Sequence, residues 1–214
     1  MNDSVSSKQI RWNGHLQPEA VDILTQPGGC IVSPTKVGYI VMTTDAQGLE
    51  RKFSAKNRNR NKPGVVLCGS MEQLRTLAQL NDEIDDGSKE LMMDGRGTSC
   101  FVIKFGTPSE HTVSDLWGRL GKLVFASSAN PSGKGNRGLV EGIGDRIEGE
   151  VDLIIEANDY VASIQPGADD RSRYEQGVMV SAVDASGTLI QLQNGDRDVR
   201  PGPVLIRKGL ACTA

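Results

Sequence analysis

Short apolar runs alternate with helix-like segments along most of the chain, and this alternation limits the fold more than any other feature. We expect helices over residues 18–24, 45–58, 70–78, 110–120 and 139–148, with capping signals at Asp45 and Ser70. We expect strands over residues 30–33, 40–43, 65–68, 101–103, 123–126, 151–155, 178–183, 188–192 and 204–207. This order favours a single α/β domain with an open, twisted, mixed sheet and flanking helices.

The polar segments between these elements are expected to lie outside the sheet. Residues 1–14 predict an extended arm, and residues 81–97 predict a connection with at most a short helix near residues 89–93. Residues 158–176 predict a surface loop. We therefore place an arm at residues 1–16, the domain at 17–210 and a short tail at 211–214.

Charge and hydropathy exclude some classes of partner. The 214 residues carry a formal net charge of −3 at pH 7, which argues against binding nucleic acid over the whole surface. No apolar run is long enough to span a membrane or to act as a signal peptide, so we expect no membrane partner. Scattered cysteines suggest free thiols in a reducing compartment, and we expect a cytoplasmic protein.

Several common catalytic motifs are absent. The four cysteines form no CxxC pair and the chain has only two histidines, so we expect neither a zinc site nor a Ser-His-Asp triad. The chain also lacks a GxxxxGK[ST] phosphate loop and a GxSxG nucleophile elbow. We assign no metal ligand and no dedicated acid–base pair.

A basic stretch at residues 51–62, RKFSAKNRNRNK, holds six Lys or Arg residues and no acid. It begins on a predicted helix, continues past its end, and is followed by the apolar run of residues 64–68. One interpretation is a solvated helix face. The other is a concentration of positive charge at the rim of a sheet, where a polyphosphate would bind.

Three polar loops lie at ends of the predicted strands: residues 34–39 and 127–133 follow strands, and residues 56–62 lead from a helix into one. Ligands bind where strands end in such loops in open α/β sheets. If the helix is interrupted at Asn57, Lys56 and Arg58 can converge on one phosphate group. Ser128 and Asn130 alternate with an alanine and offer a hydroxyl and an amide to phosphate oxygens or a purine edge. Thr35 either holds a small polar substrate or is an ordinary turn residue.

The order of these motifs resembles the YrdC-like threonylcarbamoyl-AMP synthase family. The resemblance covers about residues 17–210 and rests on five matches. They are GGCIVSPT at 28–35 with Tyr39, KNR at 56–58 before Pro63 and a strand, SANPSG at 128–133, VDLIIE at 151–156, and RKG at 207–209.

The resemblance implies an α/β domain whose positively charged cavity binds ATP with Mg²⁺. Family members condense ATP, bicarbonate and L-threonine into threonylcarbamoyl-AMP, which is used in tRNA modification. RNA and tRNA-modification proteins are therefore further partners to consider. The resemblance assigns ATP binding to Lys56, Arg58, Ser128, Asn130 and Arg207, and substrate binding to Thr35, Tyr39 and Ser181.

The chain also departs from the family pattern, mostly on the amino-acid side of the pocket. Lys36 and Val37 replace an acidic residue and a threonine, and the late S-T-V motif reads Val180-Ser181-Ala182. An A-V-R-x-P signature is not recognisable. Three hypotheses therefore stay open: a synthase using threonine or another amino acid, a non-catalytic module that binds nucleotide or RNA, and an anion site that only stabilises an interaction surface.

Overall fold

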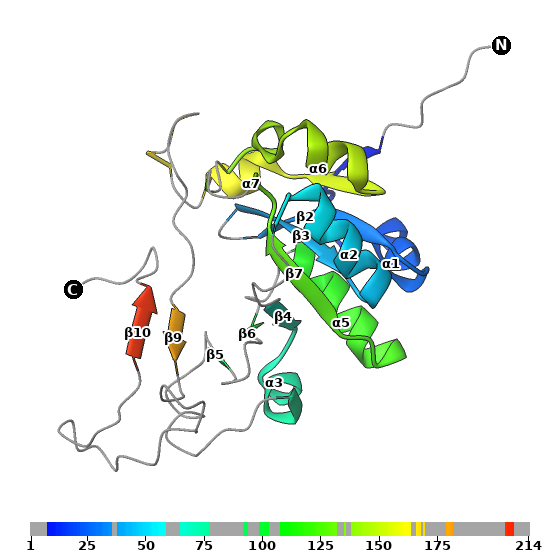
Figure 1. The fold of residues 1–214 in the computed structure, drawn as a ribbon, viewed down its shortest axis with the longest axis vertical. Coiled ribbons are helices and arrows are strands. Elements are labelled where there is room, and N and C mark those ends of the chain that lie inside the picture. Colours follow the sequence, from blue (N-terminus) through cyan, green and yellow to red (C-terminus); the bar gives the residue numbers. More distant parts are fainter. Residues whose placement is uncertain are drawn as a thin grey trace.

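A mixed sheet forms the centre of the molecule in the computed structural model (Figure 1). The structure describes residues 8–35, 38–58, 65–77, 92–93, 99–102, 108–131, 135, 138–163, 166–167, 169, 179–181 and 204–207. Within these residues the sheet has eight strands in the order β1-β8-β2-β3-β7-β4-β6-β5. Their bounds are β1 Gln9–Arg11, β2 Cys30–Thr35, β3 Gly38–Thr43, β4 Val65–Cys68, β5 Met92–Met93, β6 Ser99–Val102, β7 Val124–Ser128 and β8 Leu153–Glu156.

Parallel and antiparallel pairs coexist in this sheet. Strand β8 runs parallel to both β1 and β2, and β4 runs parallel to β6. The β2–β3, β3–β7, β4–β7 and β5–β6 pairs are antiparallel. A separate antiparallel pair joins β9 (Met179–Ser181) to β10 (Val204–Arg207). The predicted α/β fold with an open mixed sheet and flanking helices is confirmed.

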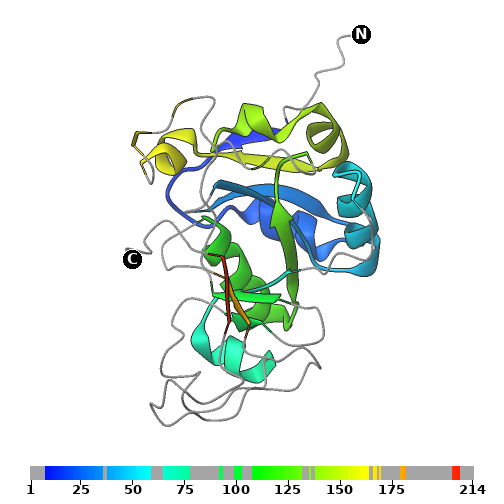
Figure 2. The same ribbon diagram turned by 60° about the vertical axis from the view of Figure 1, so that its left-hand side comes forward.

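Helices cover both faces of the sheet (Figures 1 and 2). Helices α1 (Pro18–Thr25) and α5 (Pro108–Leu120) pack on one face, where Ile31 and Met42 are buried. Helix α2 (Ala46–Ala55), the 3-10 turn η1 (Val140–Ile143), α6 (Asp145–Glu150) and α7 (Asn158–Ala162) pack on the other, against Val32 and Val41. Successive strand residues thus face opposite layers. Helix α3 spans Met71–Leu77, and no described helix has the length and hydropathy needed to cross a membrane.

Several expected boundaries differ from the structure. Strands β2 and β3 extend through Pro34 and Tyr39, which face each other in the ladder, so the turn between them is shorter than expected. The helix predicted over residues 139–148 is divided at Gly144, whose φ of 87° cannot continue a right-handed helix. Helix α2 ends at Ala55 rather than near Arg58.

Some segments expected outside the sheet contain regular structure. Part of the arm forms β1 at the edge of the sheet, where it pairs with β8. The surface loop predicted over residues 158–176 begins with α7, and Met92–Met93 form a strand instead of ending a short helix. The strand predicted over residues 188–192 lies outside the described residues.

Candidate functional site

The end of α2 is a tight reversal built around Asn57. Its φ of 47° is left-handed, a conformation that asparagine tolerates better than other residues with a side chain. The Asn57 N–H donates to the Ser54 carbonyl and the Arg58 N–H donates to the Phe53 carbonyl, both at 3.0 Å. This is the Schellman arrangement of a helix C-terminus. The interruption considered at Asn57 is therefore present, and Lys56 and Arg58 lie on either side of it.

Lys56 joins the basic stretch to the end of β7. Its side chain is buried, with only 4% of the residue exposed. The Nζ group donates to the Ser128 carbonyl oxygen and lies 3.3 Å from Ser128 Oγ. Burial, with the nearby charges of Arg58 and Lys52, lowers the pKa of Lys56 to about 7. Two of the three predicted loops thus meet at this point.

Asn130 lies just beyond Ser128 and is also buried. Its Nδ2 group donates to the Pro131 carbonyl at 2.9 Å, whereas its Oδ1 atom is buried without a hydrogen-bond partner. The adjacent Ala129 N–H donates to the Tyr39 carbonyl at 2.8 Å, which fixes the backbone here. A buried acceptor without a donor is costly, and Asn130 Oδ1 is such an unsatisfied acceptor next to the Lys56–Ser128 contact.

Positive charge at the end of α2 lacks an acidic partner among the described residues. Lys52 is 2% exposed, and its Nζ lies 5.7 Å from the centroid of the Phe53 ring. Burial, together with the charge of Arg58, lowers the pKa of Lys52 to about 8. Burial also lowers the pKa of Arg58, whose Nε atom has no hydrogen-bond partner. We call Lys52, Lys56 and Arg58 the cation cluster.

A pocket of about 450 Å³ opens beside Lys56. One wall is the end of α2, and the other combines Pro131 with the segment in which Gly144 separates η1 from α6. This volume falls in the range typical of small-molecule binding sites. The lining residues are Ala55, Lys56, Asn57, Pro131, Ile143, Gly144, Asp145, Arg146 and Ile147.

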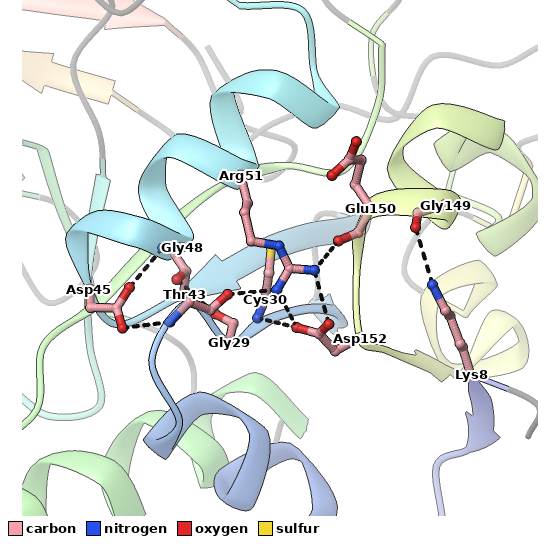
Figure 3. A network of polar contacts seen from close by, with 11 residues as sticks. Lys8, Gly29, Cys30, Thr43, Asp45, Gly48, Arg51, Gly149, Glu150 and Asp152 are labelled. Carbon is pink, nitrogen blue, oxygen red and sulfur yellow. Dashed lines mark hydrogen bonds and ion pairs between the residues drawn. The ribbon is translucent and has the colours of Figure 1, made fainter.

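Arg51, in the same basic stretch, donates four hydrogen bonds to protein groups (Figure 3). Its guanidinium forms a bidentate pair with Asp152 at 2.7 and 2.9 Å. It also donates to the carbonyl oxygens of Gly28 and Glu150. Asp152 in turn accepts from the Cys30 N–H at 2.9 Å. This network connects α2 to the starts of β2 and β8 and pairs the charge of Arg51 with that of Asp152.

Two of the residues predicted on the amino-acid side, Thr35 and Tyr39, form side-chain hydrogen bonds within the protein. Thr35 is buried and donates to the Gly38 carbonyl at 2.6 Å. The fully buried Tyr39 hydroxyl donates to Asn158 Oδ1 at 2.7 Å and accepts from the Ala157 N–H at 2.9 Å. Ser181 and Arg207 lie on the paired strands β9 and β10, and their side chains are outside the description. The substrate and nucleotide roles of these four residues stay predictions.

Sequence reasoning missed two parts of the site. Lys52 was counted only as one of six basic residues, although its i, i+4 spacing from both Gly48 and Lys56 would have placed it on the buried helix face. The second is the pocket wall around Gly144, because the sequence predicts one continuous helix over residues 139–148. The glycine within that segment was the available signal for an interruption.

Known proteins share the sequence pattern and the fold of this chain. The family model for Sua5, YciO and YrdC, described as telomere recombination, matches residues 24–166. No curated protein matches the chain significantly. A hypothetical protein from Streptococcus mutans, smu.1377c, is 52% identical, and the match covers 95% of this chain and 90% of that one with a TM-score of 0.83.

More distant structures share the fold. The match to E. coli YciO has 18% identity and a TM-score of 0.61, and covers 94% of each chain. The match to P. abyssi Sua5 complexed with L-threonine has 18% identity and a TM-score of 0.63, and covers 94% of this chain and 56% of that one. The sequence motifs, the sheet and the family match agree, and the chain belongs to the Sua5/YciO/YrdC family.

Proposed function

We propose that this protein binds ATP at the cation cluster and forms threonylcarbamoyl-AMP, or a related carbamoyl-adenylate, for tRNA modification. The observation that carries the proposal is the buried Lys56, which meets Ser128 beside the half-buried Arg58. No described carboxylate neutralises these cations. A phosphate chain would supply the missing negative charge and accept charge-assisted hydrogen bonds.

The proposed chemistry suits the groups present. A carbamate formed from bicarbonate and an amino acid attacks the α-phosphate through an oxygen, and pyrophosphate leaves. Such a reaction mainly needs the reactants held in line and the phosphate charge neutralised. Lys56 and Arg58 would do this.

Mg²⁺ would enter with the phosphates of ATP. The described residues contain no group of three His, Cys, Asp or Glu side chains that could hold a metal ion. A magnesium ion in this family reaction would be carried by phosphate oxygens, which suit it as ligands. When bound, it would neutralise part of the phosphate charge beside the cation cluster.

L-threonine is the first amino acid to test. P. abyssi Sua5, which shares the fold, has been crystallised with L-threonine. In this chain, Lys36 and Val37 occupy positions where the family pattern has an acid and a threonine, and both lie outside the described residues. A different amino acid is therefore an alternative substrate.

A non-catalytic nucleotide- or RNA-binding module is the second candidate. The observation that favours it is that protein groups already engage the Thr35 and Tyr39 hydroxyls, which the resemblance assigns to substrate binding. The net charge of −3 would confine RNA contacts to that cluster.

Pyrophosphate release tests the two candidates. The assay contains ATP, Mg²⁺ and bicarbonate, scans L-threonine against other amino acids, and uses Lys56→Ala as the site variant. Lys122→Ala is the matched control, because Lys122 precedes β7 at the end opposite Ser128. Amino-acid-dependent release that Lys56→Ala abolishes supports the enzyme. ATP binding without release under any of these conditions contradicts the enzyme and favours the module.

A further inference from the structure

Lys52 lies on the buried face of α2, directly against the sheet. Gly48, one turn earlier, packs so closely that an added Cβ atom would lie 1.6 Å from Thr43 Oγ1. Lys52 follows it by four residues, and Lys56 follows Lys52 by the same spacing. The three positions therefore form one stripe on the helix. Lys52 is the more deeply buried of the two lysines.

No described group compensates the charge of Lys52. In the described part of the chain it forms no hydrogen bond or ion pair, and its ammonium group lies over the ring of Phe53. Cys30 acts on it electrostatically, but burial raises the pKa of that thiol to about 12, so the thiol is neutral near pH 7. Asp152 is held by Arg51. A methionine would fill this position without burying a charge, so stability does not explain the lysine.

We infer that Lys52 is a third ligand-binding cation and holds a second phosphate group, next to the one held by Lys56 and Arg58. The inference rests on the proposed nucleotide site and adds Lys52 as a residue that positions the phosphate chain there. The three side chains together carry more positive charge than a single phosphate group carries negative charge. A di- or triphosphate chain has enough negative charge to pair with all three. The i, i+4 spacing places the two lysines one helical turn apart along such a chain.

Calorimetric titration of the Lys52→Met variant with ATP, tripolyphosphate and AMP tests the inference. Loss of one charge-assisted contact should weaken ATP and tripolyphosphate binding by about tenfold or more. AMP binding should change by less than about twofold, because its single phosphate needs only Lys56 and Arg58. Lys122→Met removes the same charge at the opposite end of β7 and should leave all three affinities unchanged.

Thermal unfolding without ligand shows whether the variant folds. Lys52→Met should unfold at the wild-type temperature or above it, since it removes an uncompensated buried charge. Unchanged ATP and tripolyphosphate affinities in a folded Lys52→Met variant would overturn the inference. An equal loss for AMP and ATP would also overturn it, because a second phosphate would then play no part.

A Lys56→Met variant separates this inference from the proposed function. If Lys56→Met loses ATP binding while Lys52→Met does not, the inference fails and the nucleotide site stands. If neither substitution changes ATP affinity, both fail. If wild-type protein binds tripolyphosphate but not ATP, the nucleotide proposal fails, and the tripolyphosphate affinity of Lys52→Met still decides the role of Lys52.

Discussion

Arg51 and Lys52 are neighbours on α2, yet their environments are opposite. Arg51 donates four hydrogen bonds, two of them to Asp152, and fastens the helix to β2 and β8 (Figure 3). Lys52 is more deeply buried and has no acidic partner among the described residues. One basic stretch therefore contains a cation paired with an acid and cations without an acidic partner among the described residues.

In the proposed function, this difference separates residues that stabilise the fold from residues that bind the ligand. The network of Arg51 and Asp152 holds α2 in place, so the reversal at Asn57 can present Lys56 and Arg58 at a fixed position. Burying charge without an acidic partner, as at Lys52, is expected to lower stability. The three substitutions below test this separation.

The largest expected effect is the loss of the Arg51 network. Arg51→Met leaves the Asp152 carboxylate and two backbone carbonyls without their donor, so we expect the free energy of unfolding to fall by about 2–3 kcal/mol. Urea denaturation measures this change. Lys52→Met is the matched substitution at the next residue, and it should not lower the free energy of unfolding. Equal losses at the two positions would remove the distinction between them.

The reversal at Asn57 should show an intermediate effect. A β-branched side chain is strained at its φ of 47°, so Asn57→Val should lower the free energy of unfolding by about 1–2 kcal/mol. Asn57→Gly adopts this conformation freely and should remain close to wild type. Denaturation of both variants gives the comparison. A valine variant as stable as the glycine variant would show that the left-handed turn is not required.

The smallest effect is expected at an exposed ion pair on α5. Arg119 pairs with Asp115 one turn earlier, but its side chain is 61% exposed. Solvent screens such pairs, so the stability of Arg119→Met should be indistinguishable from wild type in the same assay. A loss comparable to that of Arg51→Met would mean that ion pairing in general, rather than burial with several acceptors, determines the effect at Arg51.

The sequence predicted much of the fold and part of the site. The alternation of apolar runs indicated the α/β sheet, and the KNR and SANPSG motifs identified two segments that the structure brings together at Lys56 and Ser128. Local signals were sufficient there, because asparagine favours a left-handed turn and the strand before SANPSG is strongly apolar.

The partners within the basic stretch could not be predicted. Arg51 is separated from Asp152 by 101 positions in the sequence, so no local pattern connects them. The burial of Lys52 and Lys56 depends on how closely α2 approaches the sheet at Gly48. In the sequence, Arg51, Lys52 and Lys56 are all members of one basic stretch. Only tertiary packing distinguishes their environments.

Proton uptake on ATP binding tests the central claim most directly. The pKa values of Lys56 and Lys52, about 7 and about 8, leave both partly deprotonated without ligand near pH 8. Phosphate stabilises the charged forms and raises these pKa values, so binding should take up protons, and affinity should fall as pH rises through this range. Calorimetry at about pH 8, in two buffers of different ionisation enthalpy, measures the uptake. We predict about one proton per ATP, and less in Lys56→Met. ATP binding without proton uptake would contradict the assignment of the cation cluster as the phosphate site.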